Sequence, residues 1–151
     1  MNRFLAALVF ALTLGSNVAV AGESEDVDQA VAAAQSWLAI VDAGKFGESW
    51  DSAATTFQKG ITKANWEAAV GNVRVPIGAL RSRILMKGTE APKLIKLAVG
   101  DAVVIQFTTA FDKLAPAIEM VTPFREQDGS WRVSGYYIKP APPPAGTASP
   151  R

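Results

Sequence analysis

The sequence predicts an α+β domain, in which three N-terminal helices pack on a curved, four-stranded antiparallel sheet. Apolar residues recur at helical spacing through the first half of the chain, and alternation with a period of two begins near Ala79. The pair Asp128-Gly129 is typical of a hairpin turn between two strands. Helices that precede the strands, rather than alternate with them, are expected to lie together on one face of the sheet.

The first 21 residues have the pattern of a secretory signal peptide. The basic residue Arg3 precedes an apolar run from Phe4 to Leu14, and Ala19-Val20-Ala21 forms a cleavage site of small residues. The run is shorter than the ~20 residues of a membrane-spanning helix. We therefore expect cleavage after Ala21, a periplasmic or secreted mature protein, and no membrane span in that mature form.

Composition excludes several classes of function. The 151-residue chain has no histidine and no cysteine, which removes disulfides, thiolate nucleophiles, Ser-His-Asp triads and the usual zinc ligands. Loss of Arg3 with the signal leaves 14 basic residues, equal to the 14 acidic ones, so the mature chain lacks the positive charge that binds nucleic acid. We expect no cofactor, no metal and no nucleic-acid partner.

The three expected helices have distinct start and stop signals. The first begins at Asp26, a capping residue, and ends at Gly44. Its apolar face carries Val27, Ala30, Val31, Ala34, Leu38 and Val41. A weaker second helix spans about residues 46–57. The third begins after the N-cap Thr62 and ends at Pro76 and Gly78, with Trp66, Val70 and Val73 on its apolar face.

The expected strands are about 79–87, 103–111, 117–126 and 131–139, and whether 93–98 adds another is left open. The buried face of the first strand should carry Leu80, Ser82, Ile84 and Met86. The second should bury Val103, Ile105, Phe107, Thr109 and Phe111, and the third Ile118, Met120, Thr122 and Phe124. Residues 22–139 thus form one domain. Residues 140–151 contain five prolines and are expected to be a disordered tail.

Several segments of this domain resemble a known family. The most specific runs from Asp128 to Lys139 and reads Asp-Gly-x-Trp-Arg-Val-Ser-Gly-Tyr-Tyr-Ile-Lys; others are 37–39, 41–44, 48–50 and Arg74 with Pro76 and Gly78. Together they resemble the small exported bacterial proteins of the domain of unknown function 4019 family, over residues 28–139. More distantly, three helices on a curved sheet are similar to the cone of the nuclear-transport-factor-2-like superfamily. That superfamily includes isomerases, dehydratases, binding modules and dimerisation domains, so the resemblance implies a fold without selecting a function.

Two groups of residues are candidates for a binding site. Five aromatic residues could line a pocket for a small apolar or peptide ligand: Trp37, Trp50, Trp66, Phe107 and Tyr137. Their spacing favours a filled core, because aromatic residues at helical or strand spacing are core more often than ligand contacts. Six polar residues could form an outer sheet face that docks a second copy or an envelope protein: Arg81, Arg83, Gln106, Glu119, Arg132 and Tyr136. An ordinary solvated face is the favoured alternative for these six.

Catalysis has only carboxylates and tyrosines to use. The available acids and bases are Asp42, Glu48, Asp51, Glu119, Tyr136 and Tyr137. Asp42 and Glu48 fit surface positions near helix ends, and the strand alternation places Glu119 outward, so no catalytic constellation can be assembled. The sequence therefore favours a non-enzymatic exported module that binds an unknown small molecule or envelope protein. A small acid–base enzyme and a dimerising envelope subunit remain as alternatives.

Overall fold

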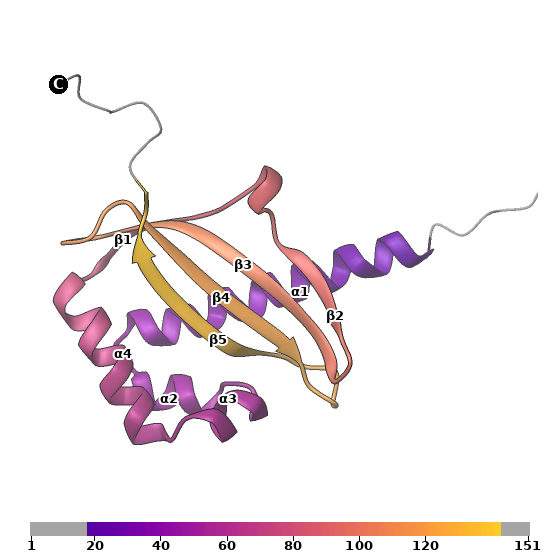
Figure 1. Cartoon of the computed structure of the whole chain (residues 1–151), viewed down its shortest axis with the longest axis horizontal. Helices are drawn as coiled ribbons and strands as arrows, with labels where there is room; N and C mark the ends of the chain where they lie inside the picture. The colour runs from indigo at the N-terminus through magenta and orange to yellow at the C-terminus, as the bar shows by residue number, and fades with distance from the viewer. Residues whose placement is uncertain (1–17, 143–151) are drawn as a thin grey trace, which may run out of the picture.

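A computed structural model describes residues 18–142 and confirms the α+β class: a five-stranded antiparallel sheet carries four α-helices on one face (Figure 1). The helices are α1 (Val18–Asp42), α2 (Phe46–Asp51), α3 (Thr55–Gly60) and α4 (Lys63–Ile77). The strands are β1 (Leu80–Leu85), β2 (Lys93–Leu97), β3 (Gly100–Phe111), β4 (Ala117–Arg125) and β5 (Trp131–Pro140). A short 3₁₀ turn, η1 (Gly88–Glu90), lies between β1 and β2. The predicted counts of three helices and four strands are therefore wrong.

The first helix is longer than predicted. It begins at Val18, so Asp26 lies inside α1 and forms an ion pair with Arg125 of β4 instead of capping the helix. Most of the predicted signal peptide, residues 1–17, lies outside the described part of the chain. No helix within residues 18–142 is both long and apolar enough to cross a bilayer.

The predicted second helix is two short helices. The break between α2 and α3 contains the buried residues Ala53 and Ala54, and the Ala54 N–H donates to the carbonyl of Val133 in β5 at 2.8 Å. The chain leaves helical geometry here because this backbone bond and the buried alanines fix it against the sheet. The Trp50 indole then donates to the Ile61 carbonyl at 2.8 Å and closes the loop between α3 and α4.

The boundaries of α4 confirm two of the sequence signals, Thr62 and Gly78, whereas Pro76, which was expected to help end the helix, lies inside it. The Thr62 side chain accepts from the Asn65 N–H at 3.3 Å, and Gly78 ends the helix at φ +82. The buried residues of this helix follow a spacing of four, Trp66, Val70 and Arg74, whereas Val73 is exposed. The expectation that Val73 continues the buried face is therefore wrong, and a buried arginine takes that place.

The sheet has the order β1-β3-β4-β5, and β2 pairs with the other half of β3, on the same side as β1. The residues predicted as the buried face of β3 are buried, from Val103 to Phe111. The predicted faces are inverted from Ser82 onward in β1 and from Ile118 to Thr122 in β4: Ile84 points outward and is 64% exposed, and Glu119 points inward and is fully buried. Phe124 is buried as predicted, and Leu80 pairs with the buried Phe111. A bulge between Leu80 and Ser82 shifts the alternation along β1, whereas the bulge opposite Thr122 and Pro123 has its extra residue, Ser134, in β5 and leaves the alternation of β4 unchanged.

The core lies between the inward face of the sheet and the helices. It contains Ala30, Ala34, Leu38 and Val41 of α1, which confirms most of the predicted face of that helix, together with Trp37, Trp66, Ile105, Phe107 and Val121. Ser49 of α2 is buried among the indoles: its carbonyl accepts from Trp37 Nε1 at 2.8 Å, and its hydroxyl accepts from Trp66 Nε1 at 2.9 Å. Both indole N–H groups are thereby paired without solvent.

Candidate functional site

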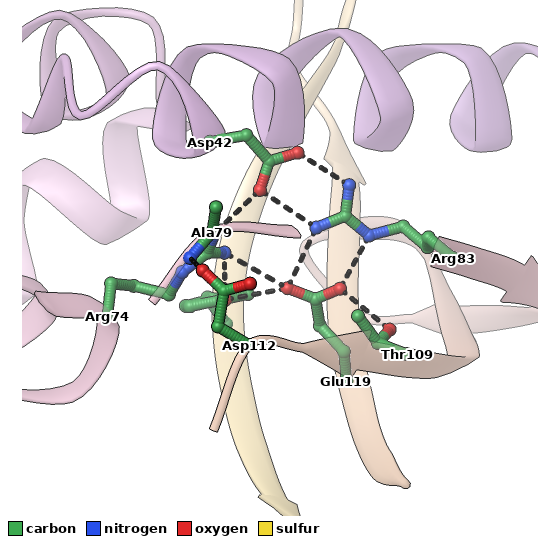
Figure 2. Close-up of polar contacts among 8 residues, drawn as sticks. Asp42, Arg74, Ala79, Arg83, Thr109, Asp112 and Glu119 are labelled. Carbon is green, nitrogen blue, oxygen red and sulfur yellow. Dashed lines mark hydrogen bonds and ion pairs between the residues drawn. The ribbon is translucent and has the colours of Figure 1, made fainter. Parts of the chain in front are cut away.

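Six polar side chains meet between the helices and the sheet, and we call them the polar cluster: Asp42, Arg74, Arg83, Thr109, Glu119 and Tyr136. They come from six different elements, α1, α4, β1, β3, β4 and β5. Figure 2 shows the two arginines between the carboxylates of Asp42 and Glu119. The strand register explains the meeting, because β3 pairs Thr109 with Arg83 and Phe107 with Glu119, and paired residues share one face of a sheet.

Glu119 is the centre of the polar cluster and has no exposed surface. Arg83 donates to it from Nε at 2.6 Å and from Nη2 at 3.1 Å. Tyr136 donates at 2.7 Å and Thr109 at 3.0 Å, and Arg74 Nη1 lies 3.4 Å from Oε1. Every one of these groups is a donor, which is the environment of an ionised, acceptor-only carboxylate.

Asp42 holds the other side of both guanidinium groups. Arg83 donates to its two oxygens at 2.7 and 3.0 Å, and Arg74 Nη2 donates to Oδ1 at 2.7 Å. Burial opposes the charged form of Asp42, but the hydrogen bonds from Arg83 and Arg74 outweigh it and hold the pKa of this carboxyl below its ordinary value. Burial likewise opposes the charge on Arg83, and its bonds to Asp42 and Glu119 outweigh that and raise its pKa.

Tyr136 connects the polar cluster to the aromatic core. Its ring lies 5.4 Å from Trp37 and 6.2 Å from Trp66, both in edge-on geometry, and its hydroxyl accepts from Arg74 at 3.1 Å. Burial and the neighbouring charge of Glu119 raise the pKa of Tyr136 well above its ordinary value. At neutral pH the phenol is therefore a fixed hydrogen-bond donor.

The charges of the polar cluster cancel, since two arginines face two carboxylates. Buried ion pairs are stable only when further hydrogen bonds satisfy the remaining atoms, and Thr109 and Tyr136 supply these to Glu119. One polar atom is an exception: Arg74 Nε is buried without a hydrogen-bond partner among the described residues. The guanidinium of Arg74 also lies 4.6 Å from the ring centre of Phe111, which fixes its plane.

Comparison with protein families matches residues 33–136 to a family described as Protein of unknown function (DUF4019). This match covers the helices from the middle of α1 onward and every strand, including all six residues of the polar cluster. The chain belongs to this family. Comparison with curated proteins and with solved structures gives no significant match.

The aromatic residues predicted to line a pocket of this DUF4019 protein do not come together around a hollow. Trp37, Trp66 and Phe107 are buried in the core, and Trp50 packs on its edge. Tyr137 points to the opposite side of the sheet and is 58% exposed. The helix-facing side of the sheet is thus a filled core at these positions. A ligand role for these residues remains a prediction.

The six residues predicted to share an outer face are divided between the two sides of the sheet. Arg83, Glu119 and Tyr136 point inward and belong to the polar cluster, so their outward placement is wrong. Arg81, Gln106 and Arg132 point away from the helices. Arg81 pairs with Asp112, and Arg132 lies 3.7 Å from Asp128.

Three members of the polar cluster were not recognised as site residues from the sequence. Asp42 was expected at the surface, whereas its carboxylate is mostly buried against both arginines. Arg74 and Thr109 were not proposed as site residues at all. The sequence did contain a signal for each of them. Arg74 follows Trp66 and Val70 at a spacing of four, which places it on the buried face of α4, and Thr109 was already on the predicted inward face of β3. Glu48 is exposed as expected and pairs with Lys45, and Asp51 is also exposed and pairs with Lys63.

Several clefts open on the described surface, and four of them are the best formed. One, of about 710 Å³, lies where α3 meets the β4–β5 hairpin and is lined by Thr55, Lys59, Gly100, Arg125 and Glu126 among others. Others of about 420 and 200 Å³ lie beside α2 and between α1 and β5. A cleft of about 240 Å³ is lined by Asp42 and Arg74 and is the one that meets the polar cluster. Among residues 18–142, no group of three or more acidic side chains is arranged to hold a metal ion.

The buried phenol predicts a loss of stability at alkaline pH. Because the folded-state pKa of Tyr136 exceeds the unfolded value of about 10, the unfolded chain releases this proton first, so stability is retained below pH ~10 and falls as pH rises above it. The slope from one such group approaches ~1.4 kcal/mol per pH unit. Urea unfolding between about pH 8 and 11 should show a smaller decline for Tyr136→Phe than for the wild type. The neighbouring Tyr137→Phe should keep the wild-type slope, and equal slopes in all three proteins would contradict the assignment.

Proposed function

We propose that this DUF4019 protein is an exported, non-enzymatic binding module that assembles with a second copy of itself through the bare face of its sheet. The proposal rests on one observation, which is that the side of the sheet opposite the helices is uncovered and carries apolar side chains. In the described part of the chain no helix covers it, and Figure 1 shows it facing the viewer. Large apolar side chains stand on it, and exposed apolar patches of this kind mark interaction sites.

The strand register builds this outer face from two neighbouring rows. One row pairs Ile84 with Thr108 and Thr108 with Ile118, and it ends at the exposed Lys139 of β5, which pairs with Ile118. The next row pairs Gln106 with Met120 and Met120 with Tyr137. Apart from Lys139 at the edge of the sheet, none of these side chains is charged, and Ile84 and Tyr137 are the most exposed of the large apolar ones, at 64% and 58%. We call this surface, residues Ile84, Gln106, Thr108, Ile118, Met120 and Tyr137, the outer patch.

The lack of charge on the outer patch favours a second copy of this chain as its binding partner. A two-fold interface brings each residue near its own counterpart, so a patch with net charge repels itself, and an uncharged patch does not. The equal numbers of acidic and basic residues after removal of Arg3 also prevent overall repulsion between copies. The outer patch has six side chains, fewer than the ~20–30 residues a side of a standard interface, so we expect a weak, reversible dimer.

Export is proposed from the signal-peptide pattern of residues 1–21. The mature protein would then act in the periplasm or outside the cell, where stability without disulfides depends on packing. The helices on one face of an antiparallel sheet also suit the cone of the nuclear-transport-factor-2-like superfamily, and we propose that similarity as the finer description of the fold.

A small acid–base enzyme is the second candidate, because a carboxylate and a tyrosine, Glu119 and Tyr136, lie together inside the fold at 2.7 Å. Binding is favoured over catalysis for two reasons. The oxygens of Glu119 already accept from Arg83, Thr109 and Tyr136, so a substrate would have to displace a protein donor. Neither Glu119 nor Tyr136 lines any of the four clefts.

Sedimentation equilibrium of the exported, processed protein tests the proposal. We expect a reversible monomer–dimer equilibrium for the wild type and a weakening of at least about tenfold for Ile84→Arg and Tyr137→Arg, because each change buries a charge in the interface. Val99→Arg is the matched control: Val99 is 80% exposed at the β2–β3 turn, outside the outer patch, and the variant should dimerise like the wild type. A wild-type monomer at all concentrations, or equal weakening by the control, would overturn the proposal.

A further inference from the structure

The sheet has an open edge at β5. This strand ends the order β1-β3-β4-β5, so one side of its backbone pairs with β4 and the other side has no neighbour among the described strands (Figure 1). The first part of the outer side is covered, because the carbonyl of Val133 accepts from the N–H of Ala54, just before α3. Apart from β4, the elements that pack closely on β5 are α1 and α3. We call the remaining part, residues 134–139, the open edge.

Backbone alternation shows which groups the open edge offers. The N–H and C=O groups of consecutive residues in a strand point to opposite sides, so every second residue of β5 bonds with β4. The Ala141 N–H donates to the carbonyl of Pro116, just before β4, at 3.0 Å. Counting back by twos, Tyr137 also bonds with β4. The N–H and C=O groups of Tyr136 and Ile138 therefore point to the open side.

The other side of the sheet gives the same assignment. The carbonyl of Gln106 in β3 accepts from an N–H just beyond β1 at 2.9 Å, so Gln106 faces β1 and its neighbour Phe107 faces β4. Phe107 pairs with Glu119, so Glu119 faces β3. The next residue, Met120, then faces β5, where it pairs with Tyr137. Two independent hydrogen bonds thus agree on the direction of the β5 backbone.

The open edge has little of the charge that protects edge strands. Charged side chains on an edge strand discourage the addition of another strand. On the other side of the sheet, β1 carries two arginines and β2 carries two lysines. The open edge carries one charge, Lys139, at its far end. It is therefore the edge at which a further strand meets the least electrostatic opposition.

Side-chain contacts fix the backbone of the open edge before any partner binds. The Tyr136 hydroxyl donates to Glu119 at 2.7 Å and accepts from Arg74 at 3.1 Å. The Ser134 hydroxyl donates to the carbonyl of Thr122 in β4 at 2.8 Å. A binding edge that is already ordered loses little conformational entropy on association. The polar cluster thereby contributes to a surface that it does not itself form.

An extended peptide is the ligand that matches these groups, because a second main chain presents N–H and C=O groups at strand spacing. Side chains define its chemistry. On the outer face, Gly135 leaves space beside the exposed ring of Tyr137, which suits apolar side chains. Lys139 is exposed and forms no ion pair with any residue that the structure describes, which suits an acidic one.

We propose that the open edge binds an extended peptide segment of a partner protein. The segment adds to β5 as an antiparallel strand, with apolar residues at its centre and an acidic residue beside Lys139. This site uses the backbone at the edge of the sheet rather than the side chains of the outer patch, and it does not depend on dimerisation.

Hydrogen–deuterium exchange of the protein without peptide tests whether the edge is open. The amide protons of Tyr137 and Lys139 bond with β4, whereas those of Tyr136 and Ile138 have no neighbouring strand. We expect the latter two to exchange at least about tenfold faster than the former two. Equal protection of all four amides would overturn the proposal.

A synthetic hexapeptide measures binding directly. Acetyl-Glu-Thr-Val-Thr-Val-Thr-amide, paired antiparallel, places its Glu beside Lys139 and its second and fourth residues opposite Ile138 and Tyr136. Titrated into ¹⁵N-labelled protein, it should shift the amide signals of Tyr136 and Ile138 saturably and slow their exchange. N-methylation of its second and fourth residues removes the two donors and should weaken binding at least about tenfold. N-methylation of the third and fifth residues, whose N–H groups point to solvent, is the matched control and should leave binding unchanged.

A charge exchange provides the second readout. Lys139→Glu should weaken binding of this peptide about fivefold, and a peptide with lysine in place of its Glu should restore it. Lys87→Glu, at an exposed position beyond β1, is the control and should bind like the wild type. Absence of saturable shifts, equal binding of the two N-methylated peptides, or unchanged binding by Lys139→Glu would each overturn the proposal, whatever the oligomeric state.

Discussion

Replacement of Glu119 by alanine is expected to lower the free energy of unfolding by about 3–5 kcal/mol, because it leaves buried cations without their counter-charge. Arg83 and Arg74 would then face Asp42 alone, and Thr109 and Tyr136 would lose their acceptor. Urea unfolding at neutral pH measures the change. A loss of this size would destabilise a small domain severely, since total stabilities are about 5–15 kcal/mol.

The control for this substitution is Glu48→Ala. Glu48 also pairs with a basic residue, Lys45, but both side chains are more than half exposed, and exposed pairs contribute little. We therefore expect nearly wild-type stability for Glu48→Ala. If Glu119→Ala were as mild as this control, Glu119 would not be the buried centre of an ion network.

Arg83→Met and Arg81→Met make the second contrast, between two arginines of one strand. Arg83 forms four hydrogen bonds to the carboxylates of Asp42 and Glu119, so its loss leaves two buried acids with only Arg74, and we expect a destabilisation of about 3–5 kcal/mol. Arg81 forms a single exposed pair with Asp112, so its loss should change stability little.

Thermal and urea unfolding of the two β1 variants measure this contrast. The strand is short and both substitutions are arginine to methionine, so strand propensity is matched between them. Equal destabilisation would contradict the inward direction of Arg83, and greater destabilisation by Arg81→Met would indicate that Arg81 takes the buried position instead, with the bulge of β1 elsewhere.

The sequence was sufficient for the fold class and for the elements whose patterns are local. The inward face of β3, the cap at Thr62 and the turn at Asp128-Gly129 all depend on neighbours within a few residues, and all three predictions are confirmed. The face of β1 depends instead on a bulge, and that of β4 on its register with β3. Alternation alone chose the more apolar side, Ile118 and Met120, as the interior.

The polar cluster was missed for a related reason. An isolated carboxylate is costly to bury, so a reader of the sequence places Glu119 in solvent. Its burial becomes favourable only through partners distant along the chain: Arg74 lies 45 residues away and Arg83 36 residues away. No local sequence pattern indicates that these residues come together. The nearest signal was the register itself, since pairing Glu119 with Phe107 places it on the face of the core.

The alternation of side chains along β4 links the polar cluster to the proposed function. Because Glu119 and Val121 face the helices, Ile118 and Met120 of β4 must face outward, where they join Ile84 and Tyr137. Two of the charges that were expected on the outer face, Arg83 and Glu119, are therefore inside, whereas Arg81 and Arg132 stay outside, and the six residues of the outer patch carry no charge. This exchange is what makes the bare sheet a candidate surface for a second copy.

Single-cysteine crosslinking at adjacent positions of β4 tests this central claim most directly. The chain has no cysteine, so each variant carries a unique thiol. Met120 lies in the middle of the outer patch, and Val121 is fully buried on the inward face. With a short bis-maleimide, Met120→Cys is predicted to give a covalent dimer, while Val121→Cys and Val99→Cys stay monomeric. No covalent dimer from a folded Met120→Cys, or equal crosslinking at positions 120 and 121, would contradict the account.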